Sequence, residues 1–311
     1  MFRTAPIRVS PEVMRLIPLD AVPAGCASGD RLHVALVSGG GNSSPGGSGV
    51  RPLRGQGRPG TDILLERLAY VVPPLDSTST AAFFDLDRTL ISRPTPIALA
   101  SSFRRRRLLR KRDLLRATLW QLIFMLPGVD GTRRASVEGM SLLRGVPVAS
   151  LRELLGEAME DVIRPLLYAE PLELLEHHRV RGERTYLVSA SLFEIVQHVA
   201  DDLGFDGALG STCEIVGGVF TGKSLRPCYG PHKAAAVREL AIRQRIDLAA
   251  STGYSDSSSD LAFLETVGNP VAINPDRRLR HIAKRRGWPI LRFDTLLPSP
   301  TAVVETSATR R

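Results

Sequence analysis

The sequence has few cysteines, and this shortage excludes one class of protein. The three cysteines, Cys26, Cys213 and Cys228, are few and odd in number, which argues against a disulfide framework and suits a reducing cytoplasm. None of them is placed like a metal ligand or a nucleophile. We therefore look for the chemistry of this chain in other residue types.

The chain also lacks a hydrophobic run long enough to cross a bilayer. The apolar helical stretch 114–126 ends at Pro127 and is shorter than the ~20 residues that a membrane-spanning helix needs. The segment that follows Met1 lacks the continuous apolar core of a signal peptide. We expect a cytoplasmic protein without a transmembrane segment.

Acidic residues are outnumbered, and the formal net charge is +9 with a pI near 10.1. A positive field attracts anionic substrates. The run Arg104–Arg107, continued by Arg110, Lys111 and Arg112, is denser than such steering requires. It could be a solvated helix face, or it could dock to nucleic acid or to an anionic membrane. Few aromatic residues lie nearby, which argues against stacking on single-stranded nucleic acid.

Two aspartates that follow an apolar run carry the first chemical signal. The run Thr80–Phe84 has the length and aromatic content of a buried strand, and Asp85 follows it, where open α/β sheets bind ligands. Asp87 and Thr89 come next at intervals of two. Extended residues i and i+2 point to the same side, so the two carboxylates require a cation or a proton between them. Hard oxygen ligands of this kind predict magnesium.

Further polar residues follow at the ends of other predicted elements. The run Arg184–Val188 predicts a second buried strand, and it leads to Ser189 just before a helical pattern over 192–203. Small residues at a helix start leave backbone N–H groups free for an anion. Lys233 opens another helical pattern, where a cation opposes the helix dipole and a bound anion is the simplest compensation.

A last strand pattern begins at Leu248 and leads to Asp256 and Asp260. Taken singly, Ser189 could cap a helix, Lys233 could be a solvated surface charge, and Asp260 could be an acid in a first helical turn. Their succession at the ends of consecutive strands favours one shared site.

These groups resemble, in order, the four motifs of the haloacid dehalogenase (HAD) superfamily, and specifically its phosphoserine-phosphatase-like branch. The resemblance covers roughly residues 79–297 and includes Val267–Asp276 and Arg286–Pro289. It implies an α/β fold, with a Rossmann-like doubly wound parallel sheet and an α-helical cap inserted after the first strand. It also implies a phosphatase with Mg²⁺ as its cofactor.

The resemblance assigns chemical roles to three aspartates. It implies Asp85 as the nucleophile that forms an aspartyl-phosphate, and Asp87 as the general acid for the leaving group and then the base for water. It implies Asp85, the backbone carbonyl of Asp87 and Asp256 as the magnesium ligands.

Four more residues receive supporting roles from the same resemblance. Thr89 supports the first loop and belongs, with Ser189 and Lys233, to the phosphate-binding residues. Asp260 orients Lys233.

Composition and periodicity suggest how the chain is divided. We expect a flexible arm over 1–78, rich in Gly, Ser and Pro, with a short strand over 31–37 and a short helix over 62–68. Residues 95–164 show helical periodicity, and their placement resembles the helical cap of this branch. The resemblance thus implies a catalytic core over 79–94 and 165–297. Residues 298–311 form a tail.

One phosphate-binding motif is formally present and is rejected. Residues 217–224 satisfy G-x-x-x-x-G-K-S, but that loop requires a helix directly after it. Pro227 and Pro231 prevent a helix from starting at Lys223. Residues 213–222 predict instead a β-hairpin with a turn at Gly217 and Gly218.

The substrate is predicted in outline only: a small phosphorylated metabolite, with phosphoserine disfavoured. Phosphoserine phosphatases have a Glu shortly after the first motif that helps bind the substrate's ammonium group, whereas no acid occurs here from Arg88 through Arg112. Arg93 lies near the matching place. Asp113 or Glu138 of the cap could still supply the missing contact. The alternative function is a protein that docks to RNA or to an anionic membrane through its basic cap region, with secondary phosphatase activity.

Overall fold

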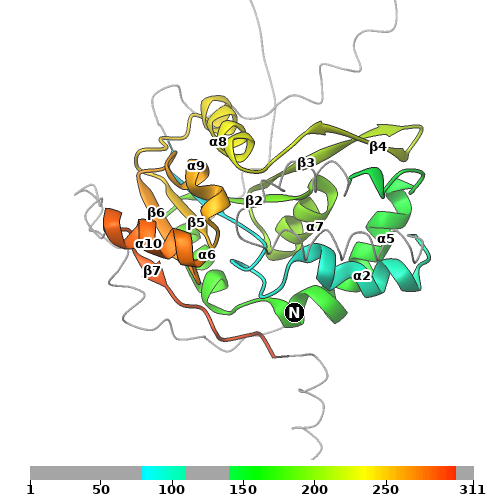
Figure 1. The fold of residues 1–311 in the computed structure, drawn as a ribbon, viewed down its shortest axis with the longest axis horizontal. Coiled ribbons are helices and arrows are strands. Elements are labelled where there is room, and N and C mark those ends of the chain that lie inside the picture. The colour runs from blue at the N-terminus through cyan, green and yellow to red at the C-terminus, as the bar shows by residue number, and fades with distance from the viewer. Residues whose placement is uncertain (1–78, 109–139, 299–311) are drawn as a thin grey trace, which may run out of the picture. The chain divides into compact units, whose positions relative to one another are not determined.

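The structure is a computed structural model that describes residues 79–108 and 140–298 (Figure 1). The predictions for the arm over 1–78, for the apolar run 114–126, for Arg110–Arg112 and for the tail beyond 298 lie outside the described residues. The described part is built on one sheet of seven strands. The strands are β1 (Ala81–Phe84), β2 (Arg184–Leu192), β3 (Gly207–Val216), β4 (Val219–Arg226), β5 (Thr252–Ser255), β6 (Asn269–Ile273) and β7 (Ile290–Leu291).

The sheet has the order β4-β3-β2-β1-β5-β6-β7, and only the β3–β4 pair is antiparallel. β1 is central, and Phe84 is in register with Leu187 of β2 and with Tyr254 of β5. The carboxyl ends of these three strands therefore meet at the middle of one sheet edge. The order reverses there, which is where open α/β sheets bind ligands.

Helices cover both faces of the sheet. They are α2 (Thr95–Arg105), α5 (Val148–Ala158), α6 (Glu170–Val180), α7 (Phe193–Leu203), α8 (Pro231–Gln244), α9 (Leu261–Leu264) and α10 (Arg277–Arg286), with a π-helical turn, η2 (Met159–Ile163), and two 3₁₀ turns, η3 (Arg164–Leu166) and η4 (Ser258–Asp260). Every residue of β1 is buried, as expected for a parallel strand covered on both faces.

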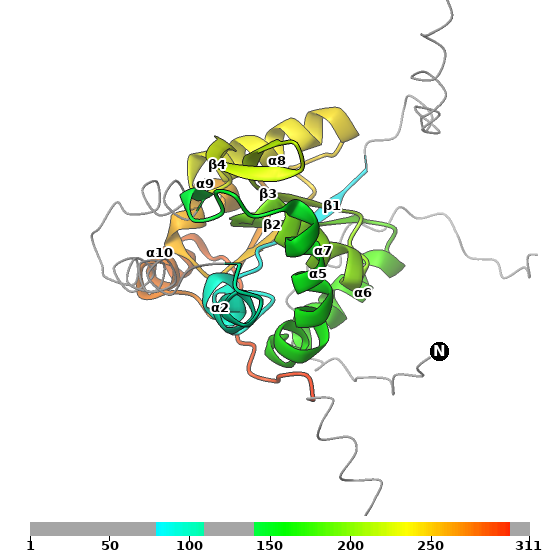
Figure 2. The same ribbon diagram turned by 90° about the vertical axis from the view of Figure 1, so that its right-hand side faces the viewer.

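The two faces of β1 belong to two separate hydrophobic clusters. Phe84 packs in a cluster with residues of α6 and α7, whereas Phe83 packs in a cluster with residues of α8, α9 and α10. Figures 1 and 2 show α8 and α9 on one side of the sheet and α7 on the other. This arrangement confirms the predicted doubly wound α/β fold.

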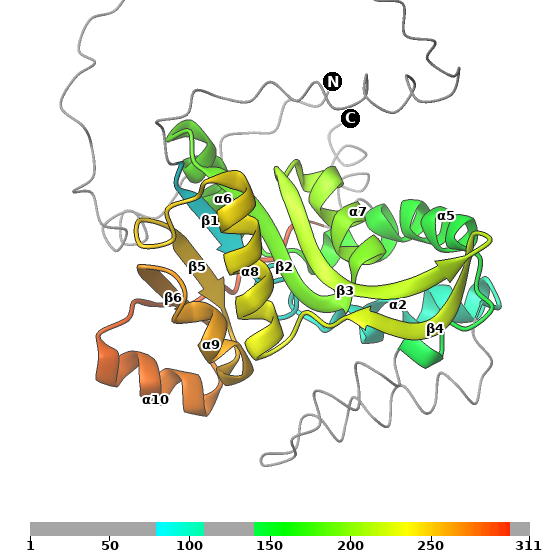
Figure 3. The same cartoon turned by 90° about the horizontal axis from the view of Figure 1, so that it is seen from above.

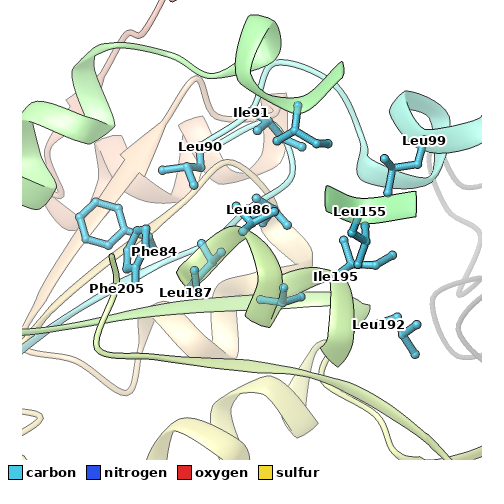
Figure 4. Close-up of a cluster of buried hydrophobic side chains, with 14 of the residues drawn as sticks. Phe84, Leu86, Leu90, Ile91, Leu99, Leu155, Leu187, Leu192, Ile195 and Phe205 are labelled. Carbon is cyan, nitrogen blue, oxygen red and sulfur yellow. The ribbon is translucent and has the colours of Figure 1, made fainter. Parts of the chain in front are cut away.

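The helices α2 and α5 come between β1 and β2 in the chain, where the cap insertion was predicted. Leu99 of α2 and Leu155 of α5 belong to the same buried cluster as Ile195 of α7 (Figure 4). The insertion therefore packs on the helix that follows β2. The exact division into cap and core stays a prediction.

Part of the basic run 104–107 makes contacts on the surface of the protein itself. Arg106 forms ion pairs with Glu157 and, at 3.3 Å, with Glu153, and so ties the end of α2 to α5. Arg105 donates a hydrogen bond to Ser102 Oγ at 3.1 Å. Of these two arginines, Arg106 links α2 to α5, whereas the contact of Arg105 lies within α2.

The predicted hairpin is present. Gly217 and Gly218 form its turn with φ of 57° and 77°, the left-handed values that a two-residue hairpin turn of type I′ needs. Lys223 lies on β4 and pairs with Glu214 at 2.9 Å, and the next helix, α8, begins only at Pro231. The residues of the rejected motif are therefore strand and turn.

The hairpin also binds a segment of the helical insertion. Gly145 N donates to Phe220 O, and Val148 N donates to Gly218 O, each at 2.9 Å. Figure 3 shows the hairpin reaching out to the side where α5 lies. The outer edge of β4 is thus covered by residues that lie far from it in sequence.

One boundary differs from the prediction. β2 continues through Leu192, so Ser189 lies inside a strand, although the sequence predicted that the strand ends at Val188 and that Ser189 stands just before a helix. The pairing of β2 with β3 shifts register between Val188 and Leu192, and this irregularity lets the chain run directly into α7.

Among the described residues, no helix has both the length and the apolar composition needed to span a membrane.

Candidate active site

Asp85 follows the last residue of β1 and lies at the centre of the site. Its backbone N–H donates to Tyr254 O of β5 at 2.9 Å, which continues the strand pairing by one residue. The carboxylate is 6% exposed and accepts a hydrogen bond from Lys233 Nζ at 2.6 Å. Burial raises the pKa of Asp85 to about 7, Asp260 and Asp87 act in the same direction, and Lys233 opposes them.

Lys233 lies in the first turn of α8 and is compensated by two carboxylates. Its Nζ is 2.6 Å from both Asp85 Oδ1 and Asp260 Oδ2. Ser255 Oγ donates to the same Asp260 oxygen at 2.8 Å, which fixes that carboxylate. Burial by itself would lower the pKa of Lys233, but Asp260 and Asp85 raise it above its usual range, so the ammonium stays charged. The anion expected at this helix start is thus provided, in this structure, by the protein.

Asp87 is surrounded by hydrogen-bond donors on both carboxylate oxygens. Oδ1 accepts from the backbone N–H of Thr95 at 2.5 Å and from the Thr95 hydroxyl. Oδ2 accepts from Ser191 Oγ at 3.1 Å and from Ser189 Oγ at 3.5 Å. Because Thr95 is the first residue of α2, Asp87 connects the sheet edge to the start of the helical insertion.

Asp256 follows β5 and faces the same space. Its side chain is 5% exposed, and Arg88 Nε lies 2.9 Å from its Oδ2. Burial raises the pKa of Asp256 to about 8, Asp85 adds to this increase, and Arg88 counteracts it. The backbone carbonyl of Asp256 accepts from Asp276 N at 2.8 Å, and Asp276 also caps α10. The loop that carries Asp256 is therefore tied to the start of α10.

The acidic residues present fit a magnesium ion. Within residues 79–108 and 140–298, no three His, Cys, Asp or Glu side chains form a cluster able to hold a metal. Magnesium needs fewer than three protein side chains, because it keeps several waters and binds through one or two carboxylates plus a substrate phosphate. Asp85 and Asp256 are two buried carboxylates, and the charge of Asp85 adds to the burial that raises the pKa of Asp256. A cation between the two carboxylates would relieve their repulsion.

Two predicted phosphate-binding residues are less directly placed. Thr89 is fully buried, and its Oγ1 has no hydrogen-bond partner among the described residues. Ser189 is also buried, and its Oγ accepts from Ser191 N at 3.0 Å. Thr89 stands two residues after Asp87 in the chain, whereas Ser189 Oγ lies 3.5 Å from Asp87 Oδ2 across the fold. The contact of either residue with a phosphate stays a prediction.

Some residues of the site were missed by sequence reasoning. Arg88 and Ser191 stand within the first and second motifs, but nothing in the sequence showed what their side chains contact. Thr95 lies eight residues beyond Asp87, and its position at a helix start was its only signal. Ser255 directly precedes Asp256 and belongs to the pattern that predicted the fourth motif.

Comparisons with known proteins agree with this geometry. A family model described as haloacid dehalogenase-like hydrolase (HAD) matches residues 82–265. The "Inhibition of morphological differentiation protein" of Streptomyces azureus is 40% identical over 69% of this chain and 78% of its own length. A "Probable phosphatase" of Mycobacterium tuberculosis is 37% identical over 74% of this chain and 83% of its own. "Phosphoserine phosphatase SerB1" of the same species is 36% identical over 71% and 73%.

Solved structures show the same fold. A protein of unknown function from Bordetella pertussis superposes with a TM-score of 0.63 and 27% identity, over 69% of this chain and 99% of that one. Because the family model matches more than half of the sequence, the chain belongs to the haloacid dehalogenase-like hydrolase family. It is a phosphatase of this family, and its mostly parallel sheet with helices on both faces is the family's fold.

Proposed function

We propose that this phosphatase is a magnesium-dependent phosphomonoester hydrolase that works through an aspartyl-phosphate on Asp85. The observation that carries the proposal is the buried contact between Asp85 Oδ1 and Lys233 Nζ at 2.6 Å. Asp87 and Asp256 complete the group at the ends of β1 and β5. A carboxylate nucleophile beside a fixed cation, with a second carboxylate two residues away, suits two-step phosphoryl transfer.

In the first step, a carboxylate oxygen of Asp85 forms a bond to phosphorus while the ester P–O bond breaks. The leaving oxygen takes a proton from Asp87, which acts as the general acid. Lys233 lies beside the Asp85 oxygen, where it can neutralise charge on the phosphoryl oxygens. The step yields an alcohol and an acyl phosphate on Asp85.

In the second step, water attacks the phosphorus, and Asp87, now a carboxylate, takes a proton from it. The bond between phosphorus and the Asp85 oxygen breaks, which releases inorganic phosphate and restores both side chains. Thr95 and Ser191 orient Asp87 through both steps by donating to opposite oxygens of its carboxylate.

Asp85, the backbone carbonyl of Asp87 and Asp256 are the residues that would bind magnesium. When bound, magnesium supplies positive charge that offsets the repulsion between a carboxylate nucleophile and an anionic phosphate. Asp276, through its backbone N–H on Asp256 O, fixes the loop that carries the third of these ligands.

The substrate we propose is a small phosphorylated metabolite in which phosphoserine is not preferred. The relative named phosphoserine phosphatase SerB1 points toward phosphoserine. Against it, residues 88–108 contain no acid to pair with an ammonium group, and Arg93 is exposed just before α2. An ammonium that loses its partner costs roughly 1 to 3 kcal/mol. Asp113 and Glu138, which could compensate, lie outside the described residues.

The test is kcat/KM with magnesium for L-phosphoserine beside a panel of sugar, glycerol and nucleotide monophosphates. We expect at least one neutral or doubly anionic substrate to exceed phosphoserine. Arg93→Gln should reduce the difference in kcat/KM between that substrate and phosphoserine, because it removes a positive charge that repels the ammonium group. A tenfold or greater lead for phosphoserine would contradict the substrate proposal and leave the reaction class intact. Undetectable phosphate release from every compound would contradict the reaction class itself.

Neither the fold nor the comparisons support a nucleic-acid or membrane partner for the basic run. Its described part contains Arg106, which is engaged with two glutamates of α5.

A further inference from the structure

Arg88 is a charged side chain of the site for which the two-step reaction provides no role. It directly follows Asp87 and has a φ of 63°, a left-handed conformation that is unfavourable for residues with a Cβ atom. Its Nε lies 2.9 Å from Asp256 Oδ2. The Arg88 guanidinium therefore forms an ion pair with a carboxylate that the proposed function needs as a metal ligand.

The two cations of the site are held very differently. Lys233 is 1% exposed and is fixed between Asp85 and Asp260, so it is a permanent part of the interior. The Arg88 side chain is 49% exposed, while that of Asp256 is 5% exposed. Arg88 thus reaches a buried carboxylate from the solvent side. It could leave that carboxylate without being buried elsewhere.

Two cations on one buried carboxylate compete. Each is attracted to the carboxylate, but in surroundings of low dielectric they repel one another strongly at short distance. Without a metal ion, the Arg88 guanidinium offsets the charge of Asp256. With a metal ion present, the same guanidinium becomes a neighbouring like charge.

We propose that Arg88 is an internal counter-ion of Asp256 that a divalent cation must displace, so that Arg88 lowers the affinity of the site for magnesium. The inference rests on the proposed function for the presence of magnesium. It goes further in assigning to a residue of this chain the control of how tightly the ion binds. The exposed side of the ion pair provides the path by which the guanidinium leaves.

The test compares two arginine substitutions, each of which removes one positive charge at a residue with left-handed φ. Arg88→Asn removes the guanidinium, and Asn tolerates left-handed φ better than other residues with a Cβ atom. Arg107→Asn is the matched control, because Arg107 is an exposed arginine with a φ of 53° that lies just after α2. Both variants change the net charge by the same amount, but only the first removes the contact with Asp256.

Magnesium binding to the full-length protein is measured by isothermal titration calorimetry with MgCl₂ and no substrate. We expect the dissociation constant to fall about tenfold in Arg88→Asn, as for removal of one close like charge, and to stay within about twofold of wild type in Arg107→Asn. If Arg88→Asn does not fold, Arg88→Gly serves instead, since glycine adopts this φ freely.

A second readout is the melting temperature of the metal-free protein. Arg88→Asn leaves the Asp256 carboxylate without its cation, so the increase in melting temperature on adding saturating MgCl₂ should be larger in this variant than in Arg107→Asn. This comparison needs no catalytic turnover.

The possible outcomes separate the two levels of proposal. If wild type binds magnesium and Arg88→Asn binds it equally or more weakly, the counter-ion proposal is wrong, and Arg88 instead orients Asp256 or has no effect on the metal. If neither wild type nor the variant binds magnesium, the proposed magnesium site fails and this inference fails with it. Tighter binding in Arg88→Asn alone supports both.

Discussion

Asp85 is the residue at which chemistry can be removed with the least change in structure. Asp85→Asn keeps the shape of the side chain and its place after β1, and Lys233 keeps its second partner, Asp260, at 2.6 Å. We expect phosphate release to fall by roughly three orders of magnitude or more, because no neighbouring group can form the same intermediate. The measurement is kcat on the best substrate of the panel, together with circular dichroism to confirm folding.

Asp202→Asn is a suitable control for this substitution, because Asp202 is a carboxylate at the end of α7 that pairs with Arg164 at 2.7 Å. It should retain wild-type turnover. Mass spectrometry of acid-quenched enzyme provides an independent check. A phosphoryl group trapped on any residue other than Asp85 would show that the nucleophile is wrongly assigned.

At this scale the sequence predicted that the carboxylates and the lysine lie together, and the structure brings Lys233 within 2.6 Å of Asp85 and Asp260. Their chemical roles stay predictions. Asp85, Asp256 and Lys233 could be placed together because each follows or opens an element whose end is visible in the hydrophobic pattern. The contact of Arg88 with Asp256 could not be predicted, since it depends on a left-handed backbone conformation of a non-glycine residue. Thr95 was missed because a contact across eight residues has no periodic signal.

At the scale of elements, the start of α2 contacts Asp87, the proposed general acid. Thr95 is fully buried, and it donates from both its N–H and its hydroxyl to Asp87 Oδ1. We expect Thr95→Val to lower kcat about tenfold or more with a smaller change in KM, because the variant keeps the shape but loses one donor that orients the acid.

Thr95→Ser, which keeps the hydroxyl, should restore most of the activity and so separates hydrogen bonding from packing. The pH dependence of kcat is the second measurement, because a loss of orientation at Asp87 should alter the acid–base profile. Wild-type kcat and an unchanged profile in Thr95→Val would show that the contact has no part in catalysis.

The prediction of elements succeeded where local chemistry determines the structure. The hairpin turn required left-handed residues, and Gly217 and Gly218 provide them. The end of β2 was misjudged, because small residues such as Ser189 are compatible with a strand or a turn, and pairing with β3 decides between them. The bonding of Gly145 and Val148 to the hairpin is a long-range backbone contact that no local pattern encodes.

For the whole molecule, the surplus of basic residues behind the net charge of +9 is unevenly distributed. Arg106 and Lys223 are paired with glutamates, and Arg286 at the end of α10 is paired with Glu265 at 2.5 Å, although α10 itself contains several basic residues and no acid. Composition predicts such a surplus, but only the fold shows which cations are neutralised. At the site the balance is reversed, since Asp85, Asp87, Asp256 and Asp260 face two cations.

This local excess of carboxylates should make the stability of the metal-free protein depend on pH. Burial raises the pKa of Asp85 to about 7 and that of Asp256 to about 8, from an ordinary value of 3.8. At pH values between the ordinary pKa of 3.8 and the raised pKa values of about 7 and about 8, the folded state binds more protons than the unfolded state. The free energy of unfolding therefore falls as the pH rises from about 5 to about 8, by more than about 1 kcal/mol for the two groups together.

Magnesium should reverse this trend, because it binds the ionised carboxylates and competes with protons. We expect the stabilisation by saturating MgCl₂, relative to EDTA, to be small near pH 5 and to grow toward pH 8. Urea unfolding at several pH values in this range measures both effects.

Burial lowers the pKa of His177, which contributes a change of opposite sign as the pH rises, so the comparison is made against Asp256→Asn. That variant should lose part of the pH slope and most of the magnesium effect. Stabilisation by magnesium that is greatest near pH 5 would contradict the assignment of Asp85 and Asp256 as its ligands.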